Sequence, residues 1–274
     1  MSDVLEIRDA GRVRTIRMNR PEALNALSDE LAWGIVGAVD EAINDDSVWV
    51  IAITGAGRAF CAGLDLKQNL SGVLDVKEKV NHSPLSEQGL FLDDMAWISR
   101  FLTILRQKCD KPVVAGINGV AVGGGLSLAL ACDIRLMAKS ARIMAGYPRI
   151  GGSPDGGMSF TLPQAIGYEQ AMRFLLENRS VDADEALRLG LVGEVVEDER
   201  FGERLAEYCA QLAKVSPVTA RLTKRDLVKA TTAIDLEAQL RLEISNIRKS
   251  LGSEDGREAQ RAFFEKREAT FRGR

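Results

Sequence analysis

The feature that most constrains this chain is an apolar stretch that runs into three consecutive glycines. Residues 112–117 form a predicted strand, and Gly123-Gly124-Gly125 opens a predicted helix with almost no polar face. A helix that is apolar all round is buried. The N–H groups of its first turn have no acceptor within the helix, so inside the protein they need another hydrogen-bond partner. These groups lie at the positive end of the helix dipole, and glycines leave them approachable. The stretch predicts either a tightly packed helix start or a site for an oxygen that becomes negatively charged.

The bulk composition excludes several classes of function. The 274 residues are 46% hydrophobic, which is enough for a large core. Thirty-six basic and 39 acidic residues give a net charge of −3, so we expect no nucleic-acid partner. We predict no membrane partner and a cytoplasmic location, because the chain has neither an apolar run long enough to span a bilayer nor a signal-peptide pattern. Four scattered cysteines without metal-ligand spacing predict buried, reduced thiols and no metal: Cys61, Cys109, Cys132 and Cys209.

The first third of the chain carries short-range signals for strands and helices. Alternating patterns at Val4–Arg8 and Val13–Met18 predict a hairpin. Ser28 is a predicted N-cap for an amphipathic helix, and Val48–Thr54 is a predicted buried strand. Residues 66–95 are polar and weakly patterned for most of their length, which is typical of a mobile lid or loop over a site.

Along the remaining two thirds of the chain, the predicted elements change from mixed strands and helices to helices. A helix is predicted from about 89 to 109, and strands at Asp133–Ala138 and Ala141–Ala145. Beyond Tyr168 nearly everything has a helical pattern. Repeated strand, turn and helix units followed by helices alone predict an α/β fold with a core over 1–195 and a helical extension over 196–274. The family resemblance described below implies that this extension is the oligomerisation region.

Two glycine-containing loops, 61–65 and 123–125, each follow a predicted buried strand. If the strands are neighbours, the amides of Leu64 and Gly124 can converge on one oxygen and form an oxyanion hole.

Two other motifs do not support a different kind of site. Gly55-Ala56-Gly57 lacks the third glycine of a dinucleotide site, and a serine triad would need His82, the chain's one histidine, whose polar surroundings favour a solvated side chain.

Motifs along nearly the whole chain carry a family resemblance. The sequence resembles the enoyl-CoA hydratase/isomerase (crotonase) family in the order and spacing of these segments: Asn19-Arg20-Pro21, Asn25-Ala26-Leu27, Ala59-Phe60-Cys61-Ala62-Gly63-Leu64-Asp65-Leu66, Ile117-Asn118-Gly119, Gly123-Gly124-Gly125, Ser153-Pro154-Asp155-Gly156-Gly157, Leu162-Pro163 and Ala262-Phe263-Phe264-Glu265-Lys266-Arg267.

This resemblance implies a fold, a substrate class and site residues. The fold is a crotonase-like spiral of ββα turns with a helical C-terminal trimerisation region, in a homotrimer or a dimer of trimers. The substrate is an acyl-CoA thioester, so CoA belongs to the substrate and no separate cofactor is implied. Leu64 and Gly124 match the positions of the two oxyanion-hole amides. Further positions match the family's CoA-binding residues, the last two from a neighbouring subunit's tail: Ala23, Leu24, Ala62, Asp65, Leu66, Phe263 and Lys266.

The chain departs from the family's hydratases at the two catalytic glutamates, where it has Ser127 and Tyr147. Ser127 is interpreted as a packing residue that bonds a carbonyl one turn back. Tyr147 either hydrogen-bonds the substrate or only fills space.

Asp155 matches the aspartate that the family's isomerases use as a proton donor and acceptor. Its alternative role is to cap the following helix. We therefore expect an enoyl-CoA double-bond isomerase with catalytic Leu64, Gly124, Asp155 and Tyr147. Hydration by an altered route and an inactive acyl-CoA-binding protein are the alternatives, and the acidic balance disfavours the RNA-binding role of one family branch.

Overall fold

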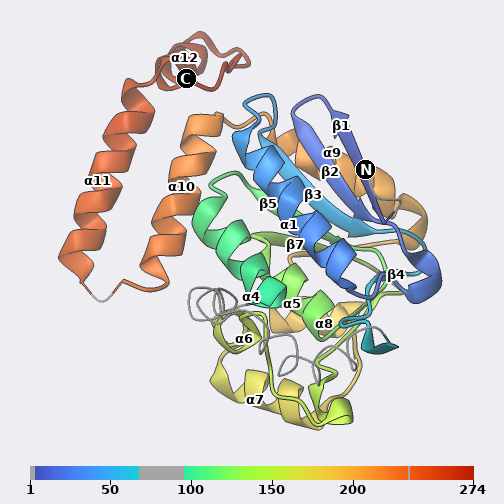
Figure 1. The fold of residues 1–274 in the computed structure, drawn as a ribbon. Helices are drawn as coiled ribbons and strands as arrows, with labels where there is room; N and C mark the ends of the chain where they lie inside the picture. Colours follow the sequence, from blue (N-terminus) through green and yellow to red (C-terminus); the bar gives the residue numbers. More distant parts are fainter. Residues whose placement is uncertain (1–3, 68–95, 234) are drawn as a thin grey trace, which may run out of the picture.

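Two β-sheets form the centre of the molecule (Figure 1). The computed structural model describes residues 4–67, 96–233 and 235–274. In the larger sheet the strand order is β1-β2-β3-β5-β7-β10, and every neighbouring pair except β1–β2 is parallel. Its strands are β1 (Leu5–Ala10), β2 (Val13–Met18), β3 (Val50–Gly55), β5 (Val113–Ile117), β7 (Ile134–Ala138) and β10 (Glu194–Val196).

The smaller sheet has the order β4-β6-β8-β9. Its strands are β4 (Ala59–Cys61), β6 (Val120–Val122), β8 (Arg142–Met144) and β9 (Val181–Asp182). The chain visits the sheets alternately: β3 is followed by β4, β5 by β6, and β7 by β8. Each turn therefore adds one parallel strand to each sheet, and the loops that leave β4, β6 and β8 follow neighbouring strands.

Helices cover the sheets and extend beyond them. In Figure 1, α1 and α4 lie in front of the sheets, while α10 and α11 run side by side away from them toward α12. The α-helices are α1 (Asp29–Asn44), α4 (Ala96–Leu102), α5 (Gly124–Ala131), α6 (Met158–Ile166), α7 (Tyr168–Glu177), α8 (Ala183–Leu189), α9 (Phe201–Leu212), α10 (Pro217–Ala230), α11 (Leu236–Gly252) and α12 (Glu254–Glu265). Shorter helical segments are η1 (Pro21–Ala23), the π-helix η2 (Thr103–Lys108), η3 (Tyr147–Ile150) and η4 (Asp198–Arg200).

Elements with a strong local signal form where they were predicted. The β1–β2 hairpin is antiparallel, with Leu5 opposite Met18. Ser28 caps α1 and accepts a hydrogen bond from the Leu31 N–H at 3.2 Å. The four cysteines are buried and free, as expected. In the part of the chain that the structure describes, no helix combines the length and the apolar character needed to cross a bilayer.

The prediction of helices alone beyond Tyr168 is wrong, because β9 and β10 lie in that region. The short strands β4 and β6 were not predicted either. Segments of two or three residues are too short to show a period of two, and their pairing partners are distant in sequence. The predicted lid, His82 and the start of the helix expected from residue 89 fall within 68–95, outside the described residues.

Ion pairs, one of them through a buried lysine, attach α10 to the core. Lys224, only 7% exposed, donates to the carboxylate of Asp133 at 2.7 Å and to the carbonyl of Lys111 at 2.9 Å. Two arginines of α10 hydrogen-bond the carboxylate of Asp110: Arg221 and Arg225. A buried charge that loses its partner is costly, so this interface fixes where the C-terminal helices leave the core.

We predict that Lys224→Met lowers the free energy of unfolding by about 3 kcal/mol, because Asp133 then remains charged without its buried partner. Urea unfolding followed by circular dichroism measures the change. Lys139→Met is the control, since Lys139 pairs with Asp184 at the exposed surface and such pairs contribute about 1 kcal/mol or less. Equal losses in the two variants would contradict the prediction.

Candidate active site

The two predicted oxyanion loops lie against each other. β4 and β6 are parallel neighbours, and the loops leave the same end of the smaller sheet. Gly63 has φ +90°, a backbone conformation that glycine adopts without strain. A methyl group added at Gly63 would lie 2.7 Å from the Val122 carbonyl oxygen and 3.6 Å from the Gly124 nitrogen. The Gly63–Leu64 peptide therefore lies next to the start of α5.

Neither candidate amide has a hydrogen-bond acceptor among the described residues. Leu27 and Leu64 form an isolated parallel bridge in which Leu27 donates to Gly63 and Asp65 donates to Leu27. This pattern leaves the Leu64 N–H unused within the described residues. Gly124 is the first residue of α5, so its N–H has no acceptor one turn back. Two N–H donors on adjacent loops are what the sequence predicted, and their convergence on one oxygen stays a prediction.

Two asparagines from the recognised motifs hold the first loop. Asn25 is fully buried, and its amide donates to the carbonyls of Ala56 and Ala59 at 2.9 and 2.8 Å. Asn118 accepts from the Gly55 N–H at 3.0 Å and donates to the Gly57 carbonyl at 2.9 Å. Hydrogen bonds from both asparagines thus fix the turn between β3 and β4, and this turn positions the 61–65 loop that follows.

The three glycines have different roles. A methyl group at Gly125 would lie 2.2 Å from the Cys61 carbonyl oxygen, so this glycine lets α5 pack directly on β4. Gly123 has φ +52° and turns the chain into the helix. The tight-packing interpretation therefore holds at Gly125, while Gly124 remains available as a donor. Burial raises the pKa of the Cys61 thiol to about 12, which makes this neighbouring cysteine a poor nucleophile.

Asp155 hydrogen-bonds Tyr147 and Ser127, the two residues at the positions where the family resemblance implies glutamates. The Tyr147 hydroxyl donates to Asp155 Oδ1 at 2.9 Å. Ser127 Oγ lies 3.2 Å from the Tyr147 oxygen and donates to the backbone carbonyl of Asp155 at 3.1 Å. Ser127 lies one turn after Gly124 on α5, and Tyr147 begins η3. The fold therefore joins Asp155, Ser127 and Tyr147 in one hydrogen-bond network, which we call the hydroxyl–carboxylate network.

The structure excludes the alternative role of Asp155 and contradicts the prediction for Ser127. Asp155 does not cap α6 with its side chain: the N-cap is Gly157, and the carboxylate turns instead to Tyr147. Ser127 does not bond a carbonyl one turn back in its own helix; it bonds across to Asp155 and Tyr147. In both cases a partner distant in sequence replaced the local hydrogen bond.

The surroundings shift both titratable groups of the network. Asp155 is exposed as a residue, yet nearby protein atoms desolvate its carboxyl group and raise its pKa, while the Tyr147 hydrogen bond partly opposes the rise. Burial also raises the pKa of Tyr147, which is 6% exposed, so its hydroxyl stays protonated and able to donate. A carboxyl group with a raised pKa beside a fixed donor is suited to accept a proton and release it again.

The sequence analysis missed an apolar wall provided by α4. Methyl groups added at Gly124 and Gly156 would lie 2.9 and 3.0 Å from the side chain of Ile98. One at Gly157 would collide with Leu102 at 2.3 Å. Ile98 thus touches both the start of α5 and the loop of Asp155. The four-residue spacing of Ile98 and Leu102 indicates one helix face but not what that face covers.

The candidate CoA-binding residues of the N-terminal half lie on two touching segments. The Ala62 N–H donates to the Leu24 carbonyl at 3.0 Å, and Leu24 has φ +52°. Ala23 precedes Leu24 in η1, and Leu66 is partly exposed beyond the loop. Asp65 is held by an ion pair with Arg20 at 3.0 Å, a partner that the sequence analysis did not identify.

Phe263 and Lys266 lie elsewhere, on α12 and at its C-cap. Figure 1 places α12 at the far end of the C-terminal helices from β4. Phe263 is 78% exposed. The chain does not bring these two residues to its own site, so their contact with CoA stays a prediction that requires a neighbouring subunit.

Comparison with known proteins agrees with this architecture. The enoyl-CoA hydratase/isomerase family matches residues 8–274, and the chain belongs to this family. The crotonase fold is matched by solved structures: an enoyl-CoA hydratase from Bacillus anthracis superimposes with a TM-score of 0.87 at 28% identity, over 99% of this chain and 100% of the other.

Relatives of similar identity carry different names. The chain is 34% identical over 240 residues to 4-chlorobenzoyl coenzyme A dehalogenase-1 from Arthrobacter sp, covering 88% of this chain and 83% of the relative. It is 32% identical over 265 residues to 1,2-epoxyphenylacetyl-CoA isomerase from Escherichia coli, covering 96% and 95%. These names denote different reactions on CoA thioesters, so similarity alone does not select one reaction for this chain.

We predict that Gly63→Ala lowers the turnover of an acyl-CoA substrate about 100-fold, the typical effect of losing one oxyanion donor. The added methyl group would meet the Val122 carbonyl and force the Leu64 amide away from Gly124. Steady-state kinetics measures the loss. Gly37→Ala on the exposed face of α1 is the control, because a methyl group there meets no atom within 4 Å and turnover should be unchanged.

Proposed function

We propose that this protein is an enoyl-CoA double-bond isomerase in which Asp155 carries the migrating proton. One observation carries the proposal: Asp155 is the carboxylate of the hydroxyl–carboxylate network, and serine and tyrosine occupy the positions of the family's two glutamates. The substrate brings its own CoA, and no further cofactor is needed for the step. The buried thiols are compatible with a reducing, cytoplasmic location.

The proton moves between two carbons of the acyl chain. The carboxylate of Asp155 takes a proton from C2 of a 3-enoyl-CoA, and the C–H electrons form an enolate whose oxygen carries the negative charge. The amides of Leu64 and Gly124 stabilise that oxygen, which lowers the barrier to its formation. The same proton then returns to C4, the double bond shifts to C2–C3, and Asp155 is ionised again.

Hydration makes a different demand on the site. Adding water requires one group to activate the water and a proton for the adjacent carbon, which the family's hydratases obtain from two glutamates. Ser127 is neutral, and the pKa of Tyr147 is raised by burial, so neither replaces a carboxylate base near neutral pH. Hydration by an altered route that uses Asp155 alone is the alternative, followed by an inactive acyl-CoA-binding protein.

The decisive experiment offers three thioesters to the enzyme in heavy water: a 3-enoyl-CoA, a 2-enoyl-CoA and 4-chlorobenzoyl-CoA. We expect interconversion of the enoyl isomers without loss of the double bond, and no chloride release. Asp155→Asn should lower this activity at least 100-fold, at the low end of the typical range for a lost acid–base group. Net water addition in place of isomerisation would reverse the order of the proposals, and binding without any turnover would favour the inactive protein.

The pH dependence follows from the same assignment. Only the ionised carboxylate of Asp155 can accept the proton, so kcat/KM should be high above the pKa of Asp155 and fall as the pH drops through it. Because desolvation raises that pKa, the fall should occur at a higher pH than for an ordinary aspartate.

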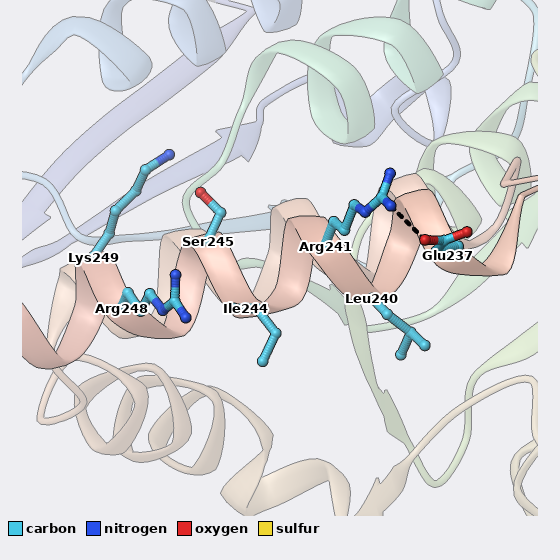
Figure 2. A pocket seen from close by; sticks show the side chains of 7 residues that line it. All are labelled: Glu237, Leu240, Arg241, Ile244, Ser245, Arg248 and Lys249. Carbon is cyan, nitrogen blue, oxygen red and sulfur yellow. Dashed lines mark hydrogen bonds and ion pairs between the residues drawn. The ribbon is translucent and has the colours of Figure 1, made fainter.

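The C-terminal helices carry an apolar face that fits the expected homotrimer. Figure 2 shows Leu240 and Ile244 projecting from one side of α11, away from Arg241 and Lys249. Ile244 is 51% exposed. Further exposed apolar side chains recur at helical spacing on α11: Leu236, Ile247 and Leu251. A contiguous apolar stripe of this kind marks a protein–protein interface. We assign it to contacts between copies of this chain.

We predict that Ile244→Asp dissociates the oligomer, because a charge would then be buried without a partner. Light scattering coupled to size-exclusion chromatography measures the mass. Lys249→Asp, on the polar side of the same helix, makes a comparable charge change and should leave the mass unaltered. A monomeric wild-type protein would contradict the assignment.

A further inference from the structure

The hydroxyl–carboxylate network keeps the same hydrogens in both protonation states of Asp155. It contains three contacts: Tyr147 to Asp155 Oδ1, Ser127 to Tyr147, and Ser127 to the Asp155 carbonyl. The two hydroxyl groups supply two hydrogens for these three contacts. A proton that Asp155 gains on Oδ2 lies outside the network and leaves these hydrogens in place.

The same arrangement of heavy atoms can therefore serve both protonation states. With the carboxylate ionised, Tyr147 donates to Oδ1. With a proton on Oδ2, Oδ1 is the carbonyl oxygen of the acid and still accepts from Tyr147. No hydrogen of the network has to move. Ser127 is 0% exposed and Tyr147 is 6% exposed, so their positions are set by packing and not by solvent.

The network also distinguishes the two carboxylate oxygens. Oδ1 accepts from Tyr147. Apart from the backbone N–H of Asp155 itself, no group among residues 4–67, 96–233 and 235–274 is hydrogen-bonded to Oδ2. Asp155 is exposed as a residue, and Oδ2 is the oxygen that the network leaves for the substrate.

We infer that Ser127 and Tyr147 are positioning residues, which fix Asp155 through Oδ1 and leave Oδ2 to exchange the proton with the acyl chain in either protonation state. This inference rests on the proposed function. A carboxyl group that takes a proton from one carbon and returns it to another must be oriented both as a base and as an acid. A site that orients only one of these protonation states would assist only one of the two proton transfers.

The electrostatic surroundings of Asp155 agree with this role. Ser127 faces it from α5 and Tyr147 from η3, while α4 presents the apolar Ile98 and Leu102 to the adjacent glycines. Tyr147 is the one titratable group among the described residues that shifts the pKa of Asp155, and its hydrogen bond lowers that pKa against the effect of desolvation.

The test is a double-mutant cycle with pH profiles. Tyr147→Phe removes the donor to Oδ1, so it should lower kcat about tenfold, leave KM nearly unchanged and move the acid limb of kcat/KM to higher pH. Ser127→Ala should act through Tyr147: we expect a smaller loss in the wild type and almost none in the Tyr147→Phe background. Tyr168→Phe, which removes an exposed hydroxyl elsewhere, is the control and should change nothing.

Additive effects of the two substitutions, or an unmoved acid limb in Tyr147→Phe, would overturn the inference. Thermal unfolding identifies variants that fail to fold; for these, Ser127→Cys and Tyr147→Trp replace the first choices. If the wild type isomerises no enoyl-CoA, the proposed function fails by itself. Isotope-edited infrared titration of the Asp155 carboxyl then decides the inference separately: Tyr147→Phe must raise its pKa, and an unchanged value rejects the role.

Discussion

The position of the site depends on one carbonyl group that two asparagines share. Asn25 and Asn118 both donate to the Ala59 carbonyl, at 2.8 and 3.2 Å, from segments almost a hundred residues apart. Buried polar groups must find partners, and here the partners come from the turn after η1 on one side and from the β5–β6 connection on the other. The loop from Cys61 to Asp65 starts from this fastened turn. Its contact with Gly124 is therefore set by the fold before any substrate arrives.

Close packing at Gly125 completes the arrangement. No side chain larger than a hydrogen fits between α5 and the Cys61 carbonyl, so α5 lies directly against β4. Its dipole then points its N-terminal amides at the neighbouring loop. One turn further along the same helix, Ser127 reaches Asp155. A single rigid helix thus sets the separation between the Gly124 amide and the candidate acid. A fixed separation is what a site needs to hold the thioester oxygen while a proton moves along the acyl chain.

What the sequence predicts well here is local. The hairpin, the Ser28 cap and the β3 strand follow from patterns within six to ten residues, and each is present. In the smaller sheet, β8 lies within the predicted strand Ala141–Ala145. The strands β4, β6 and β9 were missed because segments of two or three residues have no period of their own and form only through pairing with distant segments.

The network around Asp155 was missed in part for the same reason. A capping aspartate and a back-bonded serine are what local rules favour, whereas the observed partners lie 8 to 28 residues away. Family motifs identified which residues matter, but they did not indicate that Ser127 and Tyr147 touch Asp155.

The replacement of two carboxylates by two hydroxyls changes what the site can do. Three carboxylates within hydrogen-bonding distance would repel one another and force at least one to remain protonated. Ser127 and Tyr147 remove that repulsion and supply donors instead, so the network holds one negative charge at most. A site with one carboxylate has one proton to move at a time. Such a site suits a reaction that returns the proton it takes, and it suits poorly a reaction that must deprotonate water and protonate carbon with separate groups.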